Sequence, residues 1–158
     1  PYLYGVYNNV YREAFVFDCA MEHRPFYLPG DGSMNLQFFH VEDLCRFMER
    51  ILECKPKQHI FNVGNEESIT VRDWAEICYK TVGTTPKWVE IHEEIEQRNY
   101  FSFYNYEYAL DVTAQKEIMS QTKSLTEGLK EAYQWYRDNQ SDVNRKPYIE
   151  YIENVFSK

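Results

Sequence analysis

Apolar residues recur along this chain with two spacings, which predict helices and short strands. Val10, Ala14, Phe17 and Met21 are three or four positions apart, which predicts a helix with one apolar stripe. A second helix is predicted directly after His40, because its first turn is acidic and the helix dipole favours negative charge there. Its acids are Glu42 and Asp43, and its apolar stripe is Val41, Leu44, Cys45, Met48, Ile51 and Leu52.

Capping residues mark where two further helices begin. Thr70 can cap a helix that ends at Gly83. Ser124 and Glu127 form a capping box, in which each side chain can satisfy an amide that the helix leaves free. The buried faces predicted for these helices are Val71, Trp74, Ala75, Cys78 and Val82 for the first, and Leu125, Leu129, Ala132, Tyr133 and Tyr136 for the second.

Short apolar runs predict strands, and glycines and prolines stop them. The predicted strand segments are Tyr2 to Tyr7 (a strand end and loop), Phe26 to Leu28, His59 to Val63, and Lys87 to Ile91. Gly30-Asp31-Gly32 is expected to form a tight turn. The segment from Glu93 to Tyr108 is acidic and then aromatic, without a clean period. Short strands that alternate with helices predict an α/β fold.

The length of 158 residues predicts one domain with a sizeable core. We expect that domain over residues 1–136, followed at 137–158 by a polar linker and a short helix that begins at Pro147. This last helix would carry Ile149, Ile152 and Phe156 on one side, and another short helix is expected within 111–119. The chain begins without a methionine or a signal-peptide pattern, so we expect it to be a piece of a longer protein.

Charge and composition exclude several classes of protein. No apolar run approaches the ~18 residues of a membrane span. The net charge of -8 repels phosphate, so nucleic-acid binding is not expected. The four cysteines form no Cys-x-x-Cys pair and have apolar neighbours, which predicts reduced thiols in the core of a cytoplasmic protein.

The motifs for cofactor and proton-transfer chemistry are missing from the sequence. The six glycines do not form a dinucleotide fingerprint, and no tyrosine is followed by lysine four positions later. We therefore expect no catalytic residue and no bound cofactor in this chain alone. His92-Glu93-Glu94 is interpreted as a solvated acidic loop, His40 as a packed strand residue, and no metal site is predicted.

The order of several short motifs resembles a known family. Pro1-Tyr2-Leu3-Tyr4-Gly5 is followed by the Gly-Asp-Gly turn, by Phe39-His40-Val41 with Asp43-Leu44, and by Phe61-Asn62-Val63-Gly64. Asp111 before a short helix and Glu127-Gly128-Leu129 before Trp135 complete the order. This arrangement resembles the C-terminal, substrate-binding part of the extended short-chain dehydrogenase/reductases, the NAD(P)-dependent epimerase/dehydratase family.

The resemblance implies an incomplete Rossmann-type enzyme, without a full dinucleotide-binding fold. The parent protein would use NAD or NADP and act on a small molecule such as a nucleotide sugar, and its N-terminal Rossmann half would be the missing partner. Pro1 and Tyr2 would pass beside the cofactor. The residues implied to contact substrate are Tyr4, Asn8, Asn9, Gln37 and Arg98.

One departure from the family pattern leaves a second interpretation open. Leu36 and Gln37 stand where these enzymes usually have Arg-Asp, and leucine cannot bind the substrate diphosphate. Arg98 or Arg12 could supply that contact, since guanidinium suits phosphate. The variant also resembles an atypical branch that contains chloroplast stem-loop RNA-binding proteins. The alternative is therefore a non-catalytic module that binds RNA or protein.

The missing half would leave strand edges and apolar flanks without partners, near Tyr4 and in the segment from His59 to Val63. Unpaired edges and apolar patches recruit other chains. We therefore expect a homo-oligomer, with the tail from Pro147 to Phe156 contributing to the cover.

Overall fold

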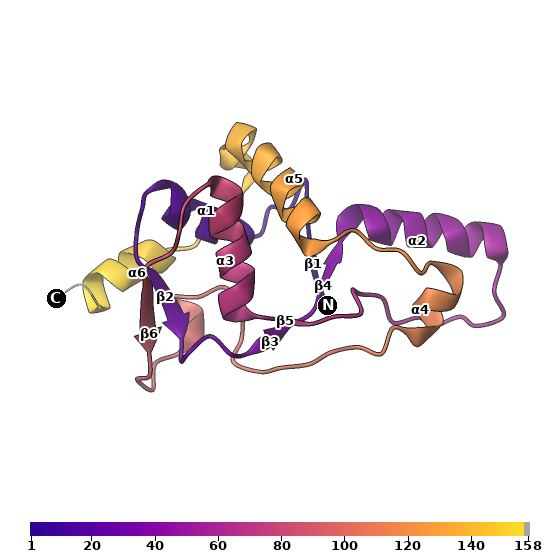
Figure 1. Ribbon diagram of the computed structural model, residues 1–158, viewed down its shortest axis with the longest axis horizontal. Helices are drawn as coiled ribbons and strands as arrows, with labels where there is room; N and C mark the ends of the chain where they lie inside the picture. Colours follow the sequence, from indigo (N-terminus) through magenta and orange to yellow (C-terminus); the bar gives the residue numbers. More distant parts are fainter. Residues whose placement is uncertain (157–158) are drawn as a thin grey trace.

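The computed structural model describes residues 1–156, in which short strands alternate with helices (Figure 1). This confirms the predicted α/β class. The strands are β1 (Tyr2–Tyr4), β2 (Phe26–Pro29), β3 (Asn35–Leu36), β4 (Phe38–His40), β5 (Ile69–Thr70) and β6 (Trp88–Ile91). The α-helices are α1 (Glu13–Met21), α2 (Val41–Cys54), α3 (Val71–Val82), α4 (Thr113–Ile118), α5 (Leu125–Asp138) and α6 (Tyr148–Val155). Two 3₁₀ turns, η1 (Gln97–Asn99) and η2 (Gln140–Asp142), complete the order.

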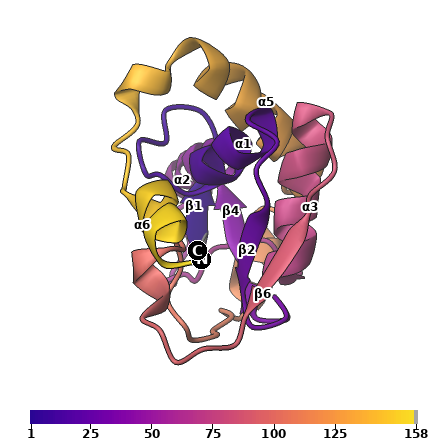
Figure 2. The same cartoon turned by 90° about the vertical axis from the view of Figure 1, so that its left-hand side faces the viewer.

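The strands form three separate pairs instead of one sheet. β1 runs parallel to β4, with Tyr4 opposite His40, and β2 runs parallel to β6. β3 and β5 form a short antiparallel pair. Figure 2 shows the two parallel pairs in the same layer, with α3 and α6 on either side.

The predicted strand from His59 to Val63 is wrong, because this segment forms no ladder within residues 1–156. Two of its apolar side chains, Phe61 and Val63, instead pack against the cluster beneath α2, whereas Ile60 is exposed. The backbone of Gly64 that follows is bound by the amide side chain of Gln115, at 2.7 and 3.0 Å. Side-chain contacts thus replace strand pairing here.

The caps at Thr70, Gly83 and Ser124 and the Gly-Asp-Gly turn are confirmed, but the reciprocal half of the capping box is not formed, because Glu127 binds the Ser124 hydroxyl and not its backbone N–H. The Thr70 hydroxyl accepts the Asp73 amide at 3.0 Å, and α3 ends at Gly83 with φ 94°. Ser124 accepts the Glu127 amide at 3.3 Å and donates its hydroxyl to the Glu127 carboxylate at 2.6 Å. In the turn after β2, both glycines have positive φ, which side chains disfavour.

Helix α1 is buried on all sides, so the prediction of a single apolar stripe was too narrow. Every residue from Glu13 to Ala20 is buried. Phe15 contacts Tyr148 of α6, with ring centroids 5.2 Å apart, and Phe17 contacts Tyr133 of α5 at 5.1 Å. A helix that is covered all round needs apolar residues all round.

The chain after α5 folds back onto α1. The Asp18 carboxylate accepts the hydroxyls of Tyr11 and Tyr136, each at 2.6 Å, and pairs with Arg145 at 2.8 Å. Helix α6 then packs on the same core, and Phe156 stacks on Tyr27. The apolar side of this tail is therefore covered by its own chain.

Helices α2 and α4 extend to one side of the main core (Figure 1). A second, smaller cluster of Phe39, Phe47 and Met119 joins them to β4. The predicted stripe of α2 is divided between two faces. Leu44 and Ile51 pack on the small cluster, whereas Met48 and Leu52 are 51% and 73% exposed.

Two of the four cysteines depart from the predicted core location. Cys19 and Cys78 are buried, but Cys45 and Cys54 are exposed on α2. All four are free thiols. None of the helices within residues 1–156 combines the length and apolarity that crossing a membrane requires.

We predict that Asp18→Asn lowers the free energy of unfolding by about 2–4 kcal/mol, because one carboxylate serves two buried hydroxyls and a guanidinium. Urea denaturation measures the change. Asp138→Asn removes the same charge from an exposed position and should shift stability by about 0.5 kcal/mol or less. Equal effects of the two substitutions would contradict this role of Asp18.

Candidate functional site

The carboxyl ends of the parallel strands β1 and β4 meet at Gly5 and His40. In open α/β sheets, ligands bind outside the carboxyl ends of the strands. Gly5 has φ 124°, and a Cβ atom on it would lie 2.6 Å from Nε2 of His40. The glycine thus gives room to the imidazole and allows the chain to turn away from β1.

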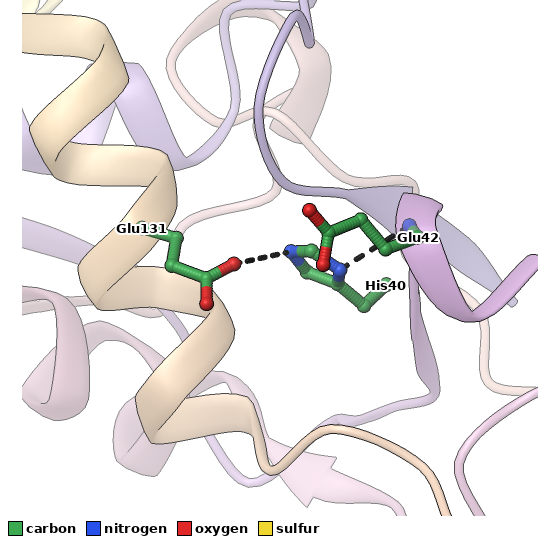
Figure 3. Close-up of side chains that lie close together, drawn as sticks. All are labelled: His40, Glu42 and Glu131. Atoms are coloured by element: carbon green, nitrogen blue, oxygen red, sulfur yellow. Dashed lines mark hydrogen bonds and ion pairs between the residues drawn. The ribbon is translucent and has the colours of Figure 1, made fainter.

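His40 ends β4 and also caps α2, a role that the sequence reading missed. Its Nδ1 accepts the backbone N–H of Glu42 at 3.3 Å (Figure 3). The neutral ring therefore carries its proton on Nε2, which lies 3.6 Å from the Glu131 carboxylate. His40 is fully buried, which confirms the prediction of a packed residue.

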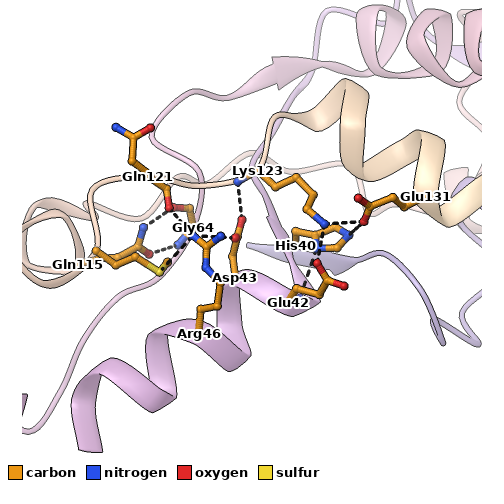
Figure 4. A network of polar contacts seen from close by, with 10 residues as sticks. His40, Glu42, Asp43, Arg46, Gly64, Gln115, Gln121, Lys123 and Glu131 are labelled. Atoms are coloured by element: carbon orange, nitrogen blue, oxygen red, sulfur yellow. Dashed lines mark hydrogen bonds and ion pairs between the residues drawn. The ribbon is translucent and has the colours of Figure 1, made fainter. Parts of the chain in front are cut away.

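Lys123 links α2 to α5 above this imidazole (Figure 4). Its ammonium lies 2.6 Å from the Glu42 carboxylate and 2.5 Å from that of Glu131. Its backbone N–H donates to the buried Asp43 carboxylate at 2.7 Å, which also faces Arg46 at 3.4 Å. The cluster therefore combines three carboxylates with two basic side chains around a neutral histidine.

The electrostatics of the cluster favour neutral His40 beside charged neighbours. Burial lowers the pKa of His40, and the Lys123 ammonium lowers it further, against the opposite effect of the nearby carboxylates. The hydrogen bond from Lys123 lowers the pKa of Glu42. Burial opposes the charge of Lys123, but its two carboxylate partners raise the pKa of the ammonium overall.

His40, Glu42 and Glu131 are close enough together to be considered as metal ligands. Two features oppose that use. The Lys123 ammonium already lies between the carboxylates, and a metal on Nε2 would need the position of the ring proton. The arrangement is better suited to pairing the Lys123 ammonium with two carboxylates and to orienting α2 than to coordinating a metal ion.

Three of the predicted substrate residues lie on β1 and the connection from β1 to α1. Tyr4 is buried beside His40, with ring centroids 5.1 Å apart. Asn8 donates to the Glu13 carboxylate at 2.7 Å, and Asn9 is exposed. The connection starts at the carboxyl end of β1, which is the end of the strand pair where His40 also lies.

The other predicted residues lie elsewhere. Gln37 precedes β4, so it is at the amino end of the parallel pair, together with Pro1 and Tyr2. Its amide group is buried and binds the backbone of Asn65 and Leu110 at 2.9–3.1 Å. Gln37 therefore ties three segments together. The substrate role of Gln37 and the cofactor role of Pro1 and Tyr2 stay predictions.

Arg98 lies on η1, where its guanidinium is 4.7 Å from the ring of Tyr104 and donates to the Ser102 carbonyl. Beside it is a cavity of about 750 Å³ between β2, β6 and the segment that follows β6. The acidic residues that line the cavity are Asp31, Glu93, Glu94, Glu96 and Glu107. His92 and its neighbouring glutamates are exposed, as the interpretation of a solvated loop required.

No pattern in the sequence indicates that Lys123 and Glu131 meet His40. Glu42 and Lys123 are 81 positions apart, so no local spacing connects them. The capping role of His40 had a local sign, because it stands directly before the acidic first turn of α2.

Solved structures of nucleotide-sugar enzymes share this fold. A dTDP-glucose 4,6-dehydratase from Streptomyces venezuelae, solved with NAD, matches 90% of the chain and 44% of its own, with 20% identity and a TM-score of 0.62. A UDP-glucuronic acid 4-epimerase from Bacillus cereus matches 87% and 43%, with 19% identity and a TM-score of 0.60. The fold is thus that of a part of a Rossmann-type epimerase or dehydratase.

Sequence relatives name the family more closely. A trifunctional UDP-glucose 4,6-dehydratase/3,5-epimerase/reductase of Arabidopsis thaliana is 30% identical over 121 residues, covering 76% of this chain and 17% of the relative. A dTDP-glucose 4,6-dehydratase of Streptomyces niveus is 25% identical over 114 residues, covering 71% and 32%. No protein-family model matches the sequence. The predicted resemblance is confirmed: homologues of this chain are NAD-dependent sugar nucleotide dehydratases and epimerases, of which it spans a third or less.

We predict that stability falls as the pH drops below about 6.5, the pKa of histidine in an unfolded chain. Because the folded state lowers the pKa of His40, the unfolded chain takes up the proton first, so stability is complete above this pH. The loss by pH 5.5 should be no more than about 1.4 kcal/mol, the limit for an imidazole that stays neutral in the folded state. Urea denaturation at a series of pH values measures it.

His40→Asn retains an acceptor for the cap but does not titrate in this range, so its stability should change less between pH 7.5 and about 5.5. His92→Asn alters an exposed histidine and should leave the pH dependence unchanged. If the two variants show the same pH dependence, the buried imidazole is not its source.

Proposed function

We propose that this chain is the substrate-binding part of an NAD(P)-dependent epimerase/dehydratase-like oxidoreductase that acts on a sugar nucleotide or a related small molecule. The supporting observation is the parallel pair β1–β4, whose carboxyl ends carry the loop with Asn8 and Asn9. The relatives are enzymes of this class, and the chain spans only part of them. In our proposal the rest of the enzyme supplies the cofactor site, and this chain alone is inactive.

The residues of this chain would hold and orient the substrate. Asn9 is exposed, and Asn8 is fixed by Glu13, so their amides can hydrogen-bond a sugar. Tyr4 would support this loop from beneath. Arg98 retains free guanidinium donors for a phosphate after its bond to Ser102. Bound NAD or NADP would supply the hydride chemistry.

Leu36 supports a changed mode of diphosphate binding. It is 2% exposed and part of the main core, so this position serves packing. Leu36→Arg would place a guanidinium among apolar side chains, where an unpaired charge is costly. We therefore assign any phosphate contact in this chain to Arg98 instead of position 36.

The alternative is a non-catalytic module with the same fold. Two observations favour it. Leu36 replaces the arginine that usually contacts the substrate diphosphate in the family, and carboxylates line the cavity beside Arg98. Both disfavour an anionic substrate. The same charge disfavours RNA, so a protein is the partner that this alternative supports. We keep a cytoplasmic location as a prediction from the four free thiols.

The test of the proposed activity uses a protein that joins this chain to a dinucleotide-binding half. Arg98→Ala and Asn9→Ala should lower its turnover of UDP- or dTDP-glucose about tenfold or more, because each removes a polar contact to the substrate. The melting temperature of Asn9→Ala should stay nearly unchanged, since exposed polar truncations cost about 0.5 kcal/mol or less, whereas half-buried Arg98 also contacts Ser102 and Tyr104, so its variant is compared at a temperature where it stays folded. Arg137→Ala, at an exposed position on α5 away from both residues, is the matched control.

Calorimetry tests the proposed division of roles between this chain and the cofactor-binding half. The 158-residue chain alone should give no binding heat with NAD or NADP, because it lacks the glycine fingerprint. Micromolar binding by the chain alone would refute the division of roles. If the joined protein turns over neither sugar nucleotide, the result favours the non-catalytic alternative.

We also propose a partner for the outer face of α2, which consists of Val41, Cys45, Met48 and Leu52. The missing cofactor half would cover it in the longer enzyme, and a second copy would cover it in the isolated chain. Met48 and Leu52 are mostly exposed, and burying such side chains gains about 1.5–3 kcal/mol each. The supporting observation is the regular spacing of this second apolar stripe on one helix.

The prediction is a dimer or larger oligomer of the isolated chain at micromolar concentration, measured by light scattering. Met48→Glu with Leu52→Glu should shift it to monomer, because charge at the centre of an apolar contact is costly. Val155→Glu changes an exposed apolar residue on α6 and should leave the mass unchanged. A monomeric mass for the unmodified chain would refute self-association.

A further inference from the structure

The segment over residues 104–109 is an exposed part of the chain between η1 and α4. Tyr104, Tyr106 and Tyr108 are 53%, 56% and 40% exposed. Their rings stand nearly parallel, with centroids 5.7 and 6.0 Å apart. Alternate residues of an extended strand are ~6.6 Å apart and share one side, which is close to the spacing of these rings. The backbone bends at Asn105 and has no turn or bend over residues 106–109.

The backbone of this segment has open hydrogen-bonding groups. Within residues 1–156, no hydrogen bond involves the N–H or C=O groups of positions 104–109. The segment is held through side chains instead: the Glu107 carboxylate accepts the Asn35 amide of β3 at 2.5 Å. Figure 1 shows it as an unpaired trace that runs past β3 and β5 toward α4. An extended run with free backbone groups is a template for another strand.

The two ends of the tyrosine row are already covered. Arg98 lies over Tyr104 at 4.7 Å, and Tyr2 lies 6.1 Å from Tyr108. The gaps of about 6 Å between the rings are too narrow for an inserted flat ring. The row therefore offers ring edges and hydroxyls beside a free backbone, which suits a peptide better than a stacked base.

Charge selects the kind of peptide. The acid-lined cavity lies directly beside the segment, and Asn105, Tyr106 and Glu107 form part of its wall. Its charged side chains are carboxylates apart from one histidine, and the whole chain carries a net charge of -8. A second copy would bring more negative charge, whereas lysine or arginine side chains would be attracted.

We propose that residues 104–109 form an open strand edge that binds an extended, basic segment of a partner protein by β-strand addition. The partner backbone pairs with the free N–H and C=O groups. Its alternate side chains, which point to one face, place lysines over the carboxylates of the cavity. The three tyrosine rings provide a rigid apolar surface next to the bound peptide. This binding is independent of the proposed enzymatic activity.

Three synthetic peptides test pairing and charge separately in calorimetric titrations with the 158-residue chain. The probe alternates lysine and valine over about eight residues, a span of ~3.3 Å per residue that exceeds the open segment. A lysine–proline peptide keeps the charge but lacks half of the backbone donors, and a glutamate–valine peptide keeps the pairing but reverses the charge. Each control should bind about tenfold more weakly or not at all.

Equal binding of the lysine–valine and lysine–proline peptides would mean that the cavity attracts any polycation, which overturns strand addition. No binding of the lysine–valine peptide also overturns it. Glu93→Gln with Glu94→Gln should weaken binding of the lysine–valine peptide about tenfold, because both line the cavity. Glu49→Gln with Glu67→Gln removes the same charge from exposed positions elsewhere and should have little effect.

Two proline variants of the chain examine the edge itself. Neighbouring N–H groups of a strand point to opposite edges, so only one of Asn105→Pro and Tyr106→Pro should remove a donor from the edge beside the acid-lined cavity, where the partner is proposed to bind. One variant should lose binding about tenfold while the other retains it, at unchanged melting temperatures. Full binding by both variants would overturn the assignment of this segment.

Discussion

The burial of α1 on every side is the constraint on which the rest of this structure depends. A helix that is apolar around its whole circumference has to be enclosed, and this chain encloses α1 with α3, α5, α6 and β2. Within α1, the buried Asp18 carboxylate contacts three side chains. They follow in the chain as one residue before α1 and two residues near the C-terminal end. The core is thus closed by residues that follow α5.

This closed core contrasts with the parallel pair β1–β4. Parallel strands occur almost only in sheets covered on both faces, and a pair of three-residue strands has little stability of its own. Here the pair is held at its amino end by the Gln37 amide and at its carboxyl end by His40. Side-chain hydrogen bonds thereby hold this strand pair in place, as neighbouring strands do in a complete sheet.

Local chemistry explains which features could be predicted from the sequence. Thr70, Gly83 and Ser124 act on amides or φ angles within a few positions, so their roles follow from neighbouring residues. The helical periods of α2, α3 and α5 were also sufficient to locate these helices. The fold class followed from the alternation of such elements and from the order of the family motifs.

Non-local contacts explain what could not be predicted. The segment from His59 to Val63 has the composition of a strand, but whether it pairs depends on which strand edges are free. The enclosure of α1 depends on residues near 148, and the cluster at His40 depends on Lys123. For the candidate site, the family motifs predicted a role for Asn8 and Asn9 that stays a prediction, and they did not indicate that Gln37 lies at the other end of the strands.

The position of Lys123 has a mechanical consequence. Its ammonium joins α2, which extends away from the main core, to α5, which belongs to that core. Such partly exposed ionic contacts weaken as salt screens them, whereas the apolar contact through Phe39 does not. The arm formed by α2 and α4 thus combines salt-sensitive and salt-resistant contacts with the core, so a rise in ionic strength weakens only part of what holds it.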